Sequence, residues 1–202
     1  MKNILITGFS PFNQERINPS YEAVKLIDMP GDIARIFKME VPTVFGDAIR
    51  IVTDAIDRLK PDIIVMVGQA GGLTKIMLER VAINLDDANM PDNSGQQPVD
   101  QPIAANGPLA YFSTLPLKPL IKELVAKGHL VGLSNSAGTY VCNHLLYGVL
   151  HHLKQHRIPA MAGFVHVPYM DAQVRNRPDV PSMTLTDMVA ALSDMIALLV
   201  KQ

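Results

Sequence analysis

Apolar residues recur along this chain in two patterns, short β-branched runs and longer stretches with helical spacing. Asn3–Gly8 and Ile63–Val67 are continuous apolar runs, as in strands that are covered on both faces. Between them, residues 48–59 place an apolar side chain every three or four positions, as on one face of a helix. The same criteria predict further strands at Ile33–Val41, Ile76–Leu85, Leu130–Leu133 and Ala160–Val167, and further helices at Pro19–Ile27, Lys118–Ala126, Thr139–Leu153 and Met183–Val200.

This alternation predicts one α/β domain over residues 1–202, with a mostly parallel sheet and helices on both of its faces. Gly68–Gly72 follows a buried strand at its carboxyl end, where open α/β sheets bind ligands. The segment Asp86–Pro108 is polar and shows little periodicity. A segment of this length without regular structure is usually functional or disordered.

Composition narrows the classes of function. The hydrophobic fraction of 48% and the charged fraction of 18% are typical of a water-soluble globular protein, and the net charge of −1 gives no field that favours nucleic acid or an anionic membrane. No run approaches the ~18 consecutive apolar residues of a membrane span. A single cysteine excludes an internal disulfide and a thiolate zinc cluster, and suits a reducing compartment, so we expect a cytoplasmic protein. No metal-ligand spacing and no nucleotide-binding glycine pattern occurs, so we expect no metal and no other cofactor.

Cys142 follows a turn of small residues, Ser134–Gly138, that leads into the predicted helix Thr139–Leu153. Free backbone amides and the positive end of the helix dipole stabilise a thiolate in a first helical turn, and the same amides can hold an oxyanion. Leucines and valines at helical spacing share its face, however. A buried structural thiol is therefore the alternative, and position alone favours it.

Two other residues stand out on predicted strands. His166 lies near the carboxyl end of Ala160–Val167, where a base could reach a ligand, and a core histidine is the alternative. Glu79 falls on the apolar side of Ile76–Leu85, so its carboxylate is expected to be buried and to need a partner. That partner could be an imidazole or a basic residue of another element. The remaining histidines are expected to be solvated or to cap helices: His129, His144, His151, His152 and His156.

A thiol, an imidazole and a carboxylate form the set that nucleophilic thiol catalysis uses: the thiol attacks, the imidazole moves the proton, and the carboxylate orients the imidazole. Several ordered motifs add to this set and together resemble the pyroglutamyl peptidase I, or pyrrolidone carboxyl peptidase, family over nearly the whole chain. They are GFSPF at 8–12, NPS at 18–20, VGQAGG at 67–72, ERVAIN at 79–84, PDNSGQQPVD at 91–100, SNSAGTYVCN at 134–143 and FVHVPY at 164–169.

The resemblance implies a thiol exopeptidase that removes N-terminal pyroglutamate from peptides, with Glu79, Cys142 and His166 at the triad positions. It also implies a three-layer α/β/α sandwich of the phosphorylase/hydrolase-like type that commonly assembles as a homotetramer. A flat, neutral lactam needs aromatic faces together with one donor and one acceptor. The positions that match the family's substrate pocket are Phe9, Phe12, Asn18, Thr43, Gln69, Met90, Tyr140 and Val141.

One position departs from the family pattern. Asn89, ten residues after Glu79, stands where the family usually has an arginine, so a fixed positive charge is missing. If that arginine stabilises negative charge during acyl transfer, its loss would lower the rate by roughly an order of magnitude or more. Two rivals remain: a family member that has lost catalysis and binds peptides, and another hydrolase or transferase on the same sandwich, such as a nucleoside phosphorylase. The latter would need an anion site, and the sequence shows no clear one.

Overall fold

A six-stranded sheet in the order β2-β1-β3-β8-β4-β7 forms the centre of the computed structural model, which describes residues 1–29 and 33–202. The neighbours β1–β2, β1–β3, β3–β8 and β4–β7 are parallel, whereas β4 runs antiparallel to β8. The predicted α/β fold with a mostly parallel, mixed sheet is therefore confirmed. The strands of this sheet are Lys2–Phe9 (β1), Ala34–Val41 (β2), Ile63–Gln69 (β3), Ile76–Glu79 (β4), Val131–Ser134 (β7) and Met161–Val167 (β8).

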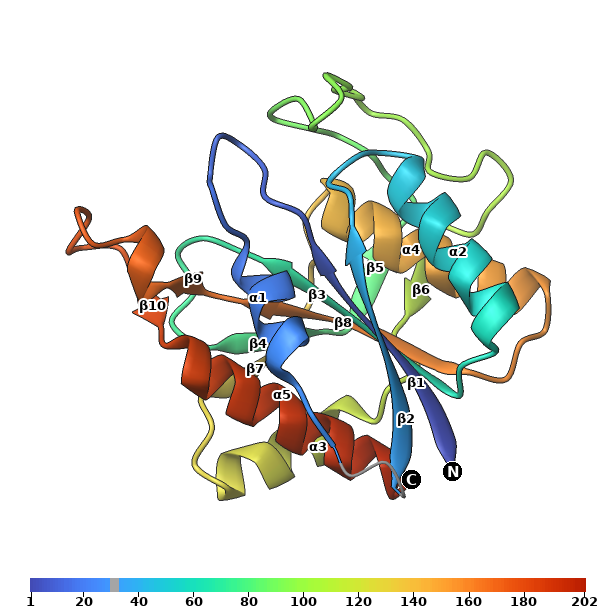
Figure 1. Ribbon diagram of the computed structural model, residues 1–202. Coiled ribbons are helices and arrows are strands. Elements are labelled where there is room, and N and C mark those ends of the chain that lie inside the picture. The colour runs from blue at the N-terminus through green and yellow to red at the C-terminus, as the bar shows by residue number, and fades with distance from the viewer. Residues whose placement is uncertain (30–32) are drawn as a thin grey trace.

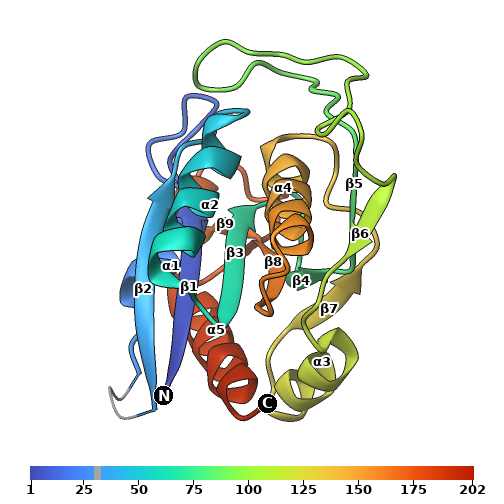
Figure 2. The same cartoon turned by 90° about the vertical axis from the view of Figure 1, so that its right-hand side faces the viewer.

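Helices cover both faces of the sheet and make three layers (Figures 1 and 2). α1 (Pro19–Leu26), α3 (Leu117–Ala126) and α5 (Leu185–Val200) pack on one face, and α2 (Asp47–Leu59) and α4 (Val141–Gln155) pack on the other. In β1, β2, β3 and β8, alternate side chains enter opposite cores, because successive side chains of a strand point to opposite faces. A strand buried on both faces must be apolar throughout, which is why the continuous apolar runs predicted the central strands correctly.

The predicted helices form because their starts and faces are encoded locally. Asn18 caps α1 by accepting the Ser20 N–H, and Pro19 occupies the first helical position, where a missing N–H costs nothing. α2 buries the apolar stripe that predicted it, and Lys60 ends the helix in a left-handed conformation before Pro61. The part of the predicted strand Ile33–Val41 that precedes Ala34 is a turn.

The predicted strand Ile76–Leu85 is wrong as a single element. The chain leaves the main sheet after Glu79, and Val81–Ile83 (β5) pairs instead with Ala110–Phe112 (β6) in a separate two-stranded sheet. A period of two persists across Arg80, so alternation alone cannot show that the pairing partner changes. Short elements that give too few repeats to be seen in the sequence are β6, β9 (Tyr169–Met170), β10 (Ser182–Met183) and a 3₁₀ turn at Asp171–Gln173.

The long segment Asp86–Pro108 contains one isolated bridge, between Asp86 and Gln101, and otherwise runs without helix or strand. It arches over α2 and α4 at the end of the molecule opposite the N-terminus, beside the loop that follows β1 (Figure 2). This is the end at which β1 and β3 finish, so the loop lies where an open sheet binds ligands. In the described ranges, no helix has the length and apolar character needed to cross a bilayer.

Candidate active site

Cys142 is the second residue of α4, which begins directly after the turn of small residues. The first helical hydrogen bond joins the His144 N–H to the Tyr140 carbonyl at 3.1 Å, so the amides of residues 141–143 precede it. Within the described part of the chain, no side chain caps this helix end. Free amides and the helix dipole can therefore stabilise a negative charge at this position. Cys142 is half-buried, whereas the leucines that follow it on α4 are fully buried.

Gly68 at the end of β3 lets the thiol approach the sheet. A Cβ at residue 68 would lie 3.0 Å from Cys142 Sγ and 2.7 Å from the Phe164 ring. Contacts this short leave room for hydrogen alone. Gly68 pairs in register with His166, so the thiol lies over β3 and over β8, the strand that carries both His166 and Phe164.

His166 and Glu79 meet because β4 runs antiparallel to β8. Met77 lies opposite His166, which makes Glu79 the diagonal neighbour of His166 on the same face of the sheet. His166 Nδ1 lies 2.7 Å from Glu79 Oε1, and both side chains are buried. Glu79 Oε2 has no hydrogen-bond partner among the described residues. A buried carboxylate with this one partner depends on His166 to compensate its charge.

The electrostatic setting of His166 favours an imidazolium. Burial lowers the pKa of His166, but the negative charge and hydrogen bond of Cys142, followed by the hydrogen bond and charge of Glu79, raise it to about 9. Since Nδ1 is bonded to Glu79, Nε2 is the ring nitrogen that remains for the thiol. The three side chains can therefore share one proton between a thiolate, an imidazole and a carboxylate.

Several residues predicted for the substrate pocket gather beside the thiol. The Phe9 ring packs on Phe164 with centroids 6.3 Å apart, and the Phe12 ring lies 6.2 Å from the ring of Tyr140, the residue before α4. Thr43 is buried and donates its hydroxyl to the Ser10 carbonyl at 3.1 Å. Loops after β1 and β2 and the start of α4 thus converge here. Of the two other predicted wall residues, Val141 is buried at the start of α4 and Met90 is half-buried in the long loop.

Asn18 and Gln69 have most of their polar side-chain atoms occupied within the protein. Asn18 Oδ1 accepts the Ser20 N–H and hydroxyl at 3.1 and 2.7 Å, and its Nδ2 donates to the Ser10 carbonyl at 3.1 Å. A side-chain amide has two N–H donors, so one Nδ2 hydrogen remains beyond these contacts. Gln69 Oε1 accepts a 2.9 Å hydrogen bond from Gln173 Nε2, which ties the end of β3 to the segment after β9. Asn89 is exposed on the long loop.

Of the two roles expected for His144, solvation or helix capping, solvation is wrong. His144 is 6% exposed, and its Nδ1 lies 2.7 Å from Asp86 Oδ2, which is also buried. Asp86 and Asp92 are further buried carboxylates that sequence reasoning missed. Both lie in the polar loop, where charged residues are unremarkable, and the partner of Asp86 is 58 positions away along the chain. No local pattern marks either residue as buried.

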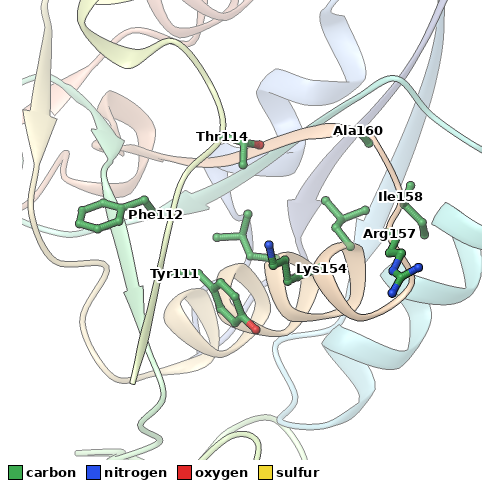
Figure 3. A pocket seen from close by; sticks show the side chains of 9 residues that line it. Tyr111, Phe112, Thr114, Lys154, Arg157, Ile158 and Ala160 are labelled. Carbon is green, nitrogen blue, oxygen red and sulfur yellow. The ribbon is translucent and has the colours of Figure 1, made fainter. Parts of the chain in front are cut away.

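A hollow of about 410 Å³ lies away from this constellation (Figure 3). It lies beside the C-terminal half of α4, ~16 Å along the helix from Cys142 at 1.5 Å per residue. The hollow is lined by Tyr111, Phe112, Thr114, Leu150, Leu153, Lys154, Arg157, Ile158 and Ala160.

In the part of the chain that is described, no three His, Cys, Asp or Glu side chains are grouped as a metal ion would need.

A thiol at a helix N-terminus, a buried imidazole beside it and a carboxylate bonded to that imidazole are typical of cysteine-dependent hydrolases. The chain belongs to the pyroglutamyl peptidase family, whose family model matches residues 2–202. The membership of this cysteine peptidase family predicted from the motifs is therefore confirmed.

Known relatives cover nearly the whole chain. Pyrrolidone-carboxylate peptidase 2 of Caldanaerobacter subterraneus is 47% identical over 198 residues, which are 98% of this chain and 96% of the relative. Pyrrolidone-carboxylate peptidase 1 of Ralstonia nicotianae is 48% identical over 95% of this chain and 90% of its own length. The crystal structure of pyroglutamyl peptidase I from Bacillus amyloliquefaciens superposes with a TM-score of 0.95 at 42% identity, covering all of this chain and 96% of the other. The structure of a mutant pyrrolidone carboxyl peptidase from P. furiosus superposes with a TM-score of 0.94 at 39% identity, over 99% of both chains.

Proposed function

We propose that this protein is a cysteine exopeptidase that removes an N-terminal pyroglutamyl (5-oxoprolyl) residue from peptides. The observation that carries the proposal is the His166–Glu79 pair, bonded at 2.7 Å beside a half-buried thiol at a helix start. A cysteine that is buried only for structural reasons needs neither a charged imidazole nor a carboxylate beside it. Burying either of these charged groups costs free energy. Family membership supports the amide after pyroglutamate as the bond that is hydrolysed.

The placement of these groups supports the following reaction. Cys142 Sγ attacks the carbonyl carbon of the pyroglutamyl residue as a thiolate, and the helix-start amides hold the oxyanion that forms. The tetrahedral intermediate collapses, the C–N bond breaks, and Nε2 of His166 gives its proton to the leaving amine. The acyl group remains as a thioester on Cys142. Water then attacks this thioester, loses its proton to His166 and releases pyroglutamate and the thiolate.

Glu79 acts on His166 in two ways in this scheme. Its Oε1 accepts the Nδ1–H, which fixes the orientation of the ring so that Nε2 faces the thiol. Its negative charge also compensates the imidazolium that persists until the leaving amine is protonated. Because both partners are buried, this compensation is little screened by solvent.

The neutral pyrrolidone ring explains the proposed pocket. Phe9, Phe12 and Tyr140 offer aromatic faces, and the free hydrogen on Asn18 Nδ2 and the backbone around Gln69 offer hydrogen bonds for the lactam. Thr43, Met90 and Val141 are proposed as further wall positions. A pyroglutamyl residue has no free amine, so a pocket without a carboxylate aimed at an ammonium group discriminates against ordinary N-termini.

Release of a fluorophore from a pyroglutamyl arylamide under reducing conditions tests the proposal. The wild-type protein should cleave this compound and leave a prolyl arylamide intact, and Cys142→Ala should lower kcat/KM by at least about a thousandfold. Full turnover by the Cys142→Ala protein would overturn the assignment of the nucleophile. Cleavage of both arylamides would overturn the proposed specificity.

Asn89 motivates the alternative of an impaired member that binds peptides. Asn89 is an exposed residue at the position that the resemblance assigns to arginine. Asn89→Arg should raise kcat by roughly tenfold if the missing charge stabilises the oxyanion. A folded wild-type protein that binds a pyroglutamyl peptide without cleaving it, and that Asn89→Arg does not activate, would favour the binding protein.

The family resemblance also supports a cytoplasmic homotetramer. A single cysteine without a disulfide partner suits a reducing compartment. Leu109, which is 89% exposed, and Phe112, which is 69% exposed, offer apolar surface for assembly near β6. Sedimentation of a monomer at micromolar concentration would reject the tetramer, and a signal for the protein outside the cytoplasmic fraction would reject the location.

A further inference from the structure

A second imidazole–carboxylate pair lies on the same helix as the thiol, two positions after it. His144 Nδ1 is 2.7 Å from Asp86 Oδ2, and His144 Nε2 accepts the Gly46 N–H at 2.9 Å. Both side chains are buried, and Asp86 Oδ1 has no partner in the described ranges. Asp86 therefore depends on His144 as Glu79 depends on His166.

The backbone amide fixes the tautomer of His144. An N–H can only donate, so Nε2 must carry the lone pair and the ring proton must sit on Nδ1, where it donates to Asp86. Both ring nitrogens are then occupied by protein groups. His144 has no nitrogen left for the thiol, so its role differs from that of His166 although it is closer to Cys142 in the sequence.

The group that His144 holds belongs to the loop between β2 and α2. Gly46 has a φ of 74° and is the N-cap of α2, and the neighbouring Phe45 N–H donates to Asp92 Oδ2 at 2.8 Å. Two adjacent amides of this loop are thus each linked to a buried carboxylate, one directly and one through an imidazole. Asp92 binds Phe45 directly, and Asp86 binds Gly46 through the imidazole of His144.

The side chain of Phe45 links this fixed loop to the proposed substrate pocket. Its ring stands edge-on to Tyr140, with centroids 5.4 Å apart, and edge-on to His144 at 5.2 Å. Tyr140 contacts Phe12 and donates its hydroxyl to the Pro91 carbonyl at 3.0 Å. A shift of the loop would therefore move Phe45, and with it the aromatic wall beside the thiol.

We propose that Asp86 and His144 are positioning residues, which hold the Thr43–Gly46 loop so that Phe45 and Tyr140 form the wall against the pyroglutamyl ring. The inference rests on the proposed function, because it assigns a part of the same site. It predicts an effect on substrate binding, expressed in KM, while the reactivity of Cys142 toward a small alkylating agent stays the same.

Two substitutions of His144 separate the two bonds of the ring. His144→Gln can place its side-chain oxygen near the position of Nε2 and keep the Gly46 bond, whereas His144→Asn can reach Asp86 but not Gly46. The Asn variant should raise KM for a pyroglutamyl arylamide about tenfold, and the Gln variant less than about threefold. Both should keep kcat and the rate of iodoacetamide alkylation of Cys142 within about threefold of wild type.

His152→Gln is the matched control. His152 also lies on α4 and bonds a carboxylate, Asp57 Oδ1, at 2.9 Å, but it lies toward the far end of the helix. It should leave KM and kcat unchanged. If the His144→Asn protein does not fold, Asp86→Asn replaces it, because that change removes the charge that keeps the proton on Nδ1, and KM should rise about threefold.

Equal KM values for His144→Asn and wild type would overturn the inference, as would a loss of kcat and alkylation rate without a rise in KM. For Asp86→Asn, an unchanged KM would overturn it. Cleavage by the unmodified chain is measured first. Failure of the proposed peptidase activity is therefore seen in wild type, whereas failure of this inference is seen in the variants alone.

Discussion

Two buried histidine–carboxylate pairs flank the start of α4, and they differ in what the second ring nitrogen faces. In the pair of His166 and Glu79, Nδ1 binds the carboxylate and Nε2 remains for Cys142. In the pair of His144 and Asp86, Nδ1 also binds the carboxylate, but Nε2 accepts the Gly46 amide. The carboxylate bonds have the same length, 2.7 Å, so the carboxylate contact alone does not distinguish a base from a structural link.

The backbone around each pair explains this difference. His166 lies on a strand beside Gly68, where the absence of a side chain leaves space for the thiol. His144 lies on α4 under the loop that begins α2, where backbone amides without helical acceptors need a partner. The same chemical pair is therefore directed to a reacting atom in one place and to the fold in the other.

Replacing the two histidines should give the largest difference between the pairs. His166→Ala removes the group that protonates the leaving amine, so kcat should fall by about a thousandfold or more. Alkylation of Cys142 by iodoacetamide near neutral pH should also slow, because the thiolate loses its cationic neighbour. Steady-state kinetics and a time course of alkylation measure both effects.

His152→Ala is the control for this substitution, because it removes a histidine–aspartate contact far from the site and should change neither quantity. A His166→Ala protein that stays folded and retains turnover within tenfold of wild type would show that His166 is a core histidine. The comparison of the two pairs would then lose its basis.

Replacing Glu79, the carboxylate of the first pair, should lower kcat/KM less than replacing His166 and should change its pH dependence. Burial lowers the pKa of His166, and Cys142 and Glu79 together raise it to about 9, so kcat/KM should decline as the pH rises through about 9. Glu79→Gln keeps the shape of the side chain but removes one of the two negative charges. The alkaline limb should move to lower pH, and kcat/KM at pH 7 should fall by about 10- to 100-fold.

The same shift makes a prediction for stability. The folded pKa of His166 lies above its unfolded value of about 6.5, so its stabilising contribution is complete below that pH and is lost as the pH rises through about 9. Denaturant unfolding of wild type and Glu79→Gln should therefore differ most below pH 6.5. If the alkaline limb of the pH profile of kcat/KM stays at the same pH in Glu79→Gln as in wild type, Glu79 does not act on the proton of His166.

The first pair and the thiol beside it could be predicted from the sequence because each of these three residues breaks a local pattern. Glu79 is a carboxylate among apolar strand positions, His166 is an imidazole near the end of an apolar strand, and Cys142 is the lone thiol after a turn of small residues. The family motifs joined these residues into one site. The layers and the main strands followed from apolar periodicity, since both faces of the sheet are covered by helices.

The second pair gave no such signal. His144 lies in a helix with polar and apolar neighbours, and Asp86 begins a polar loop, so each fits its surroundings locally. Their burial is a consequence of the long loop folding back over α4, and periodicity does not report such tertiary contacts. The change of sheet at Arg80 escaped prediction for the same reason, because strand pairing is decided by partners that are distant in the sequence.

The smallest effect is expected from replacing Asp92, which binds the same loop as the second pair, His144 and Asp86. Its Oδ1 accepts hydrogen bonds from Ser94 and Gln96, and its Oδ2 accepts the Phe45 N–H. Burial raises the pKa of Asp92, but these hydrogen bonds lower it below its usual range. Asp92→Asn leaves the Phe45 amide facing an NH₂ group, which should cost about 1–2 kcal/mol of unfolding free energy at pH 7.

The sign of this effect depends on pH. A depressed carboxyl pKa stabilises the fold above the unfolded value of about 4, and this contribution is lost as the pH falls through the folded value. Wild type and Asp92→Asn should therefore converge in urea unfolding at acidic pH, while Asp100→Asn, an exposed change in the same loop, should match wild type throughout. KM should rise in Asp92→Asn as in His144→Asn, because both hold adjacent amides of one loop. Lower stability with an unchanged KM would mean that the Gly46 bond suffices to place Phe45, and it would confine the positioning role to Asp86 and His144.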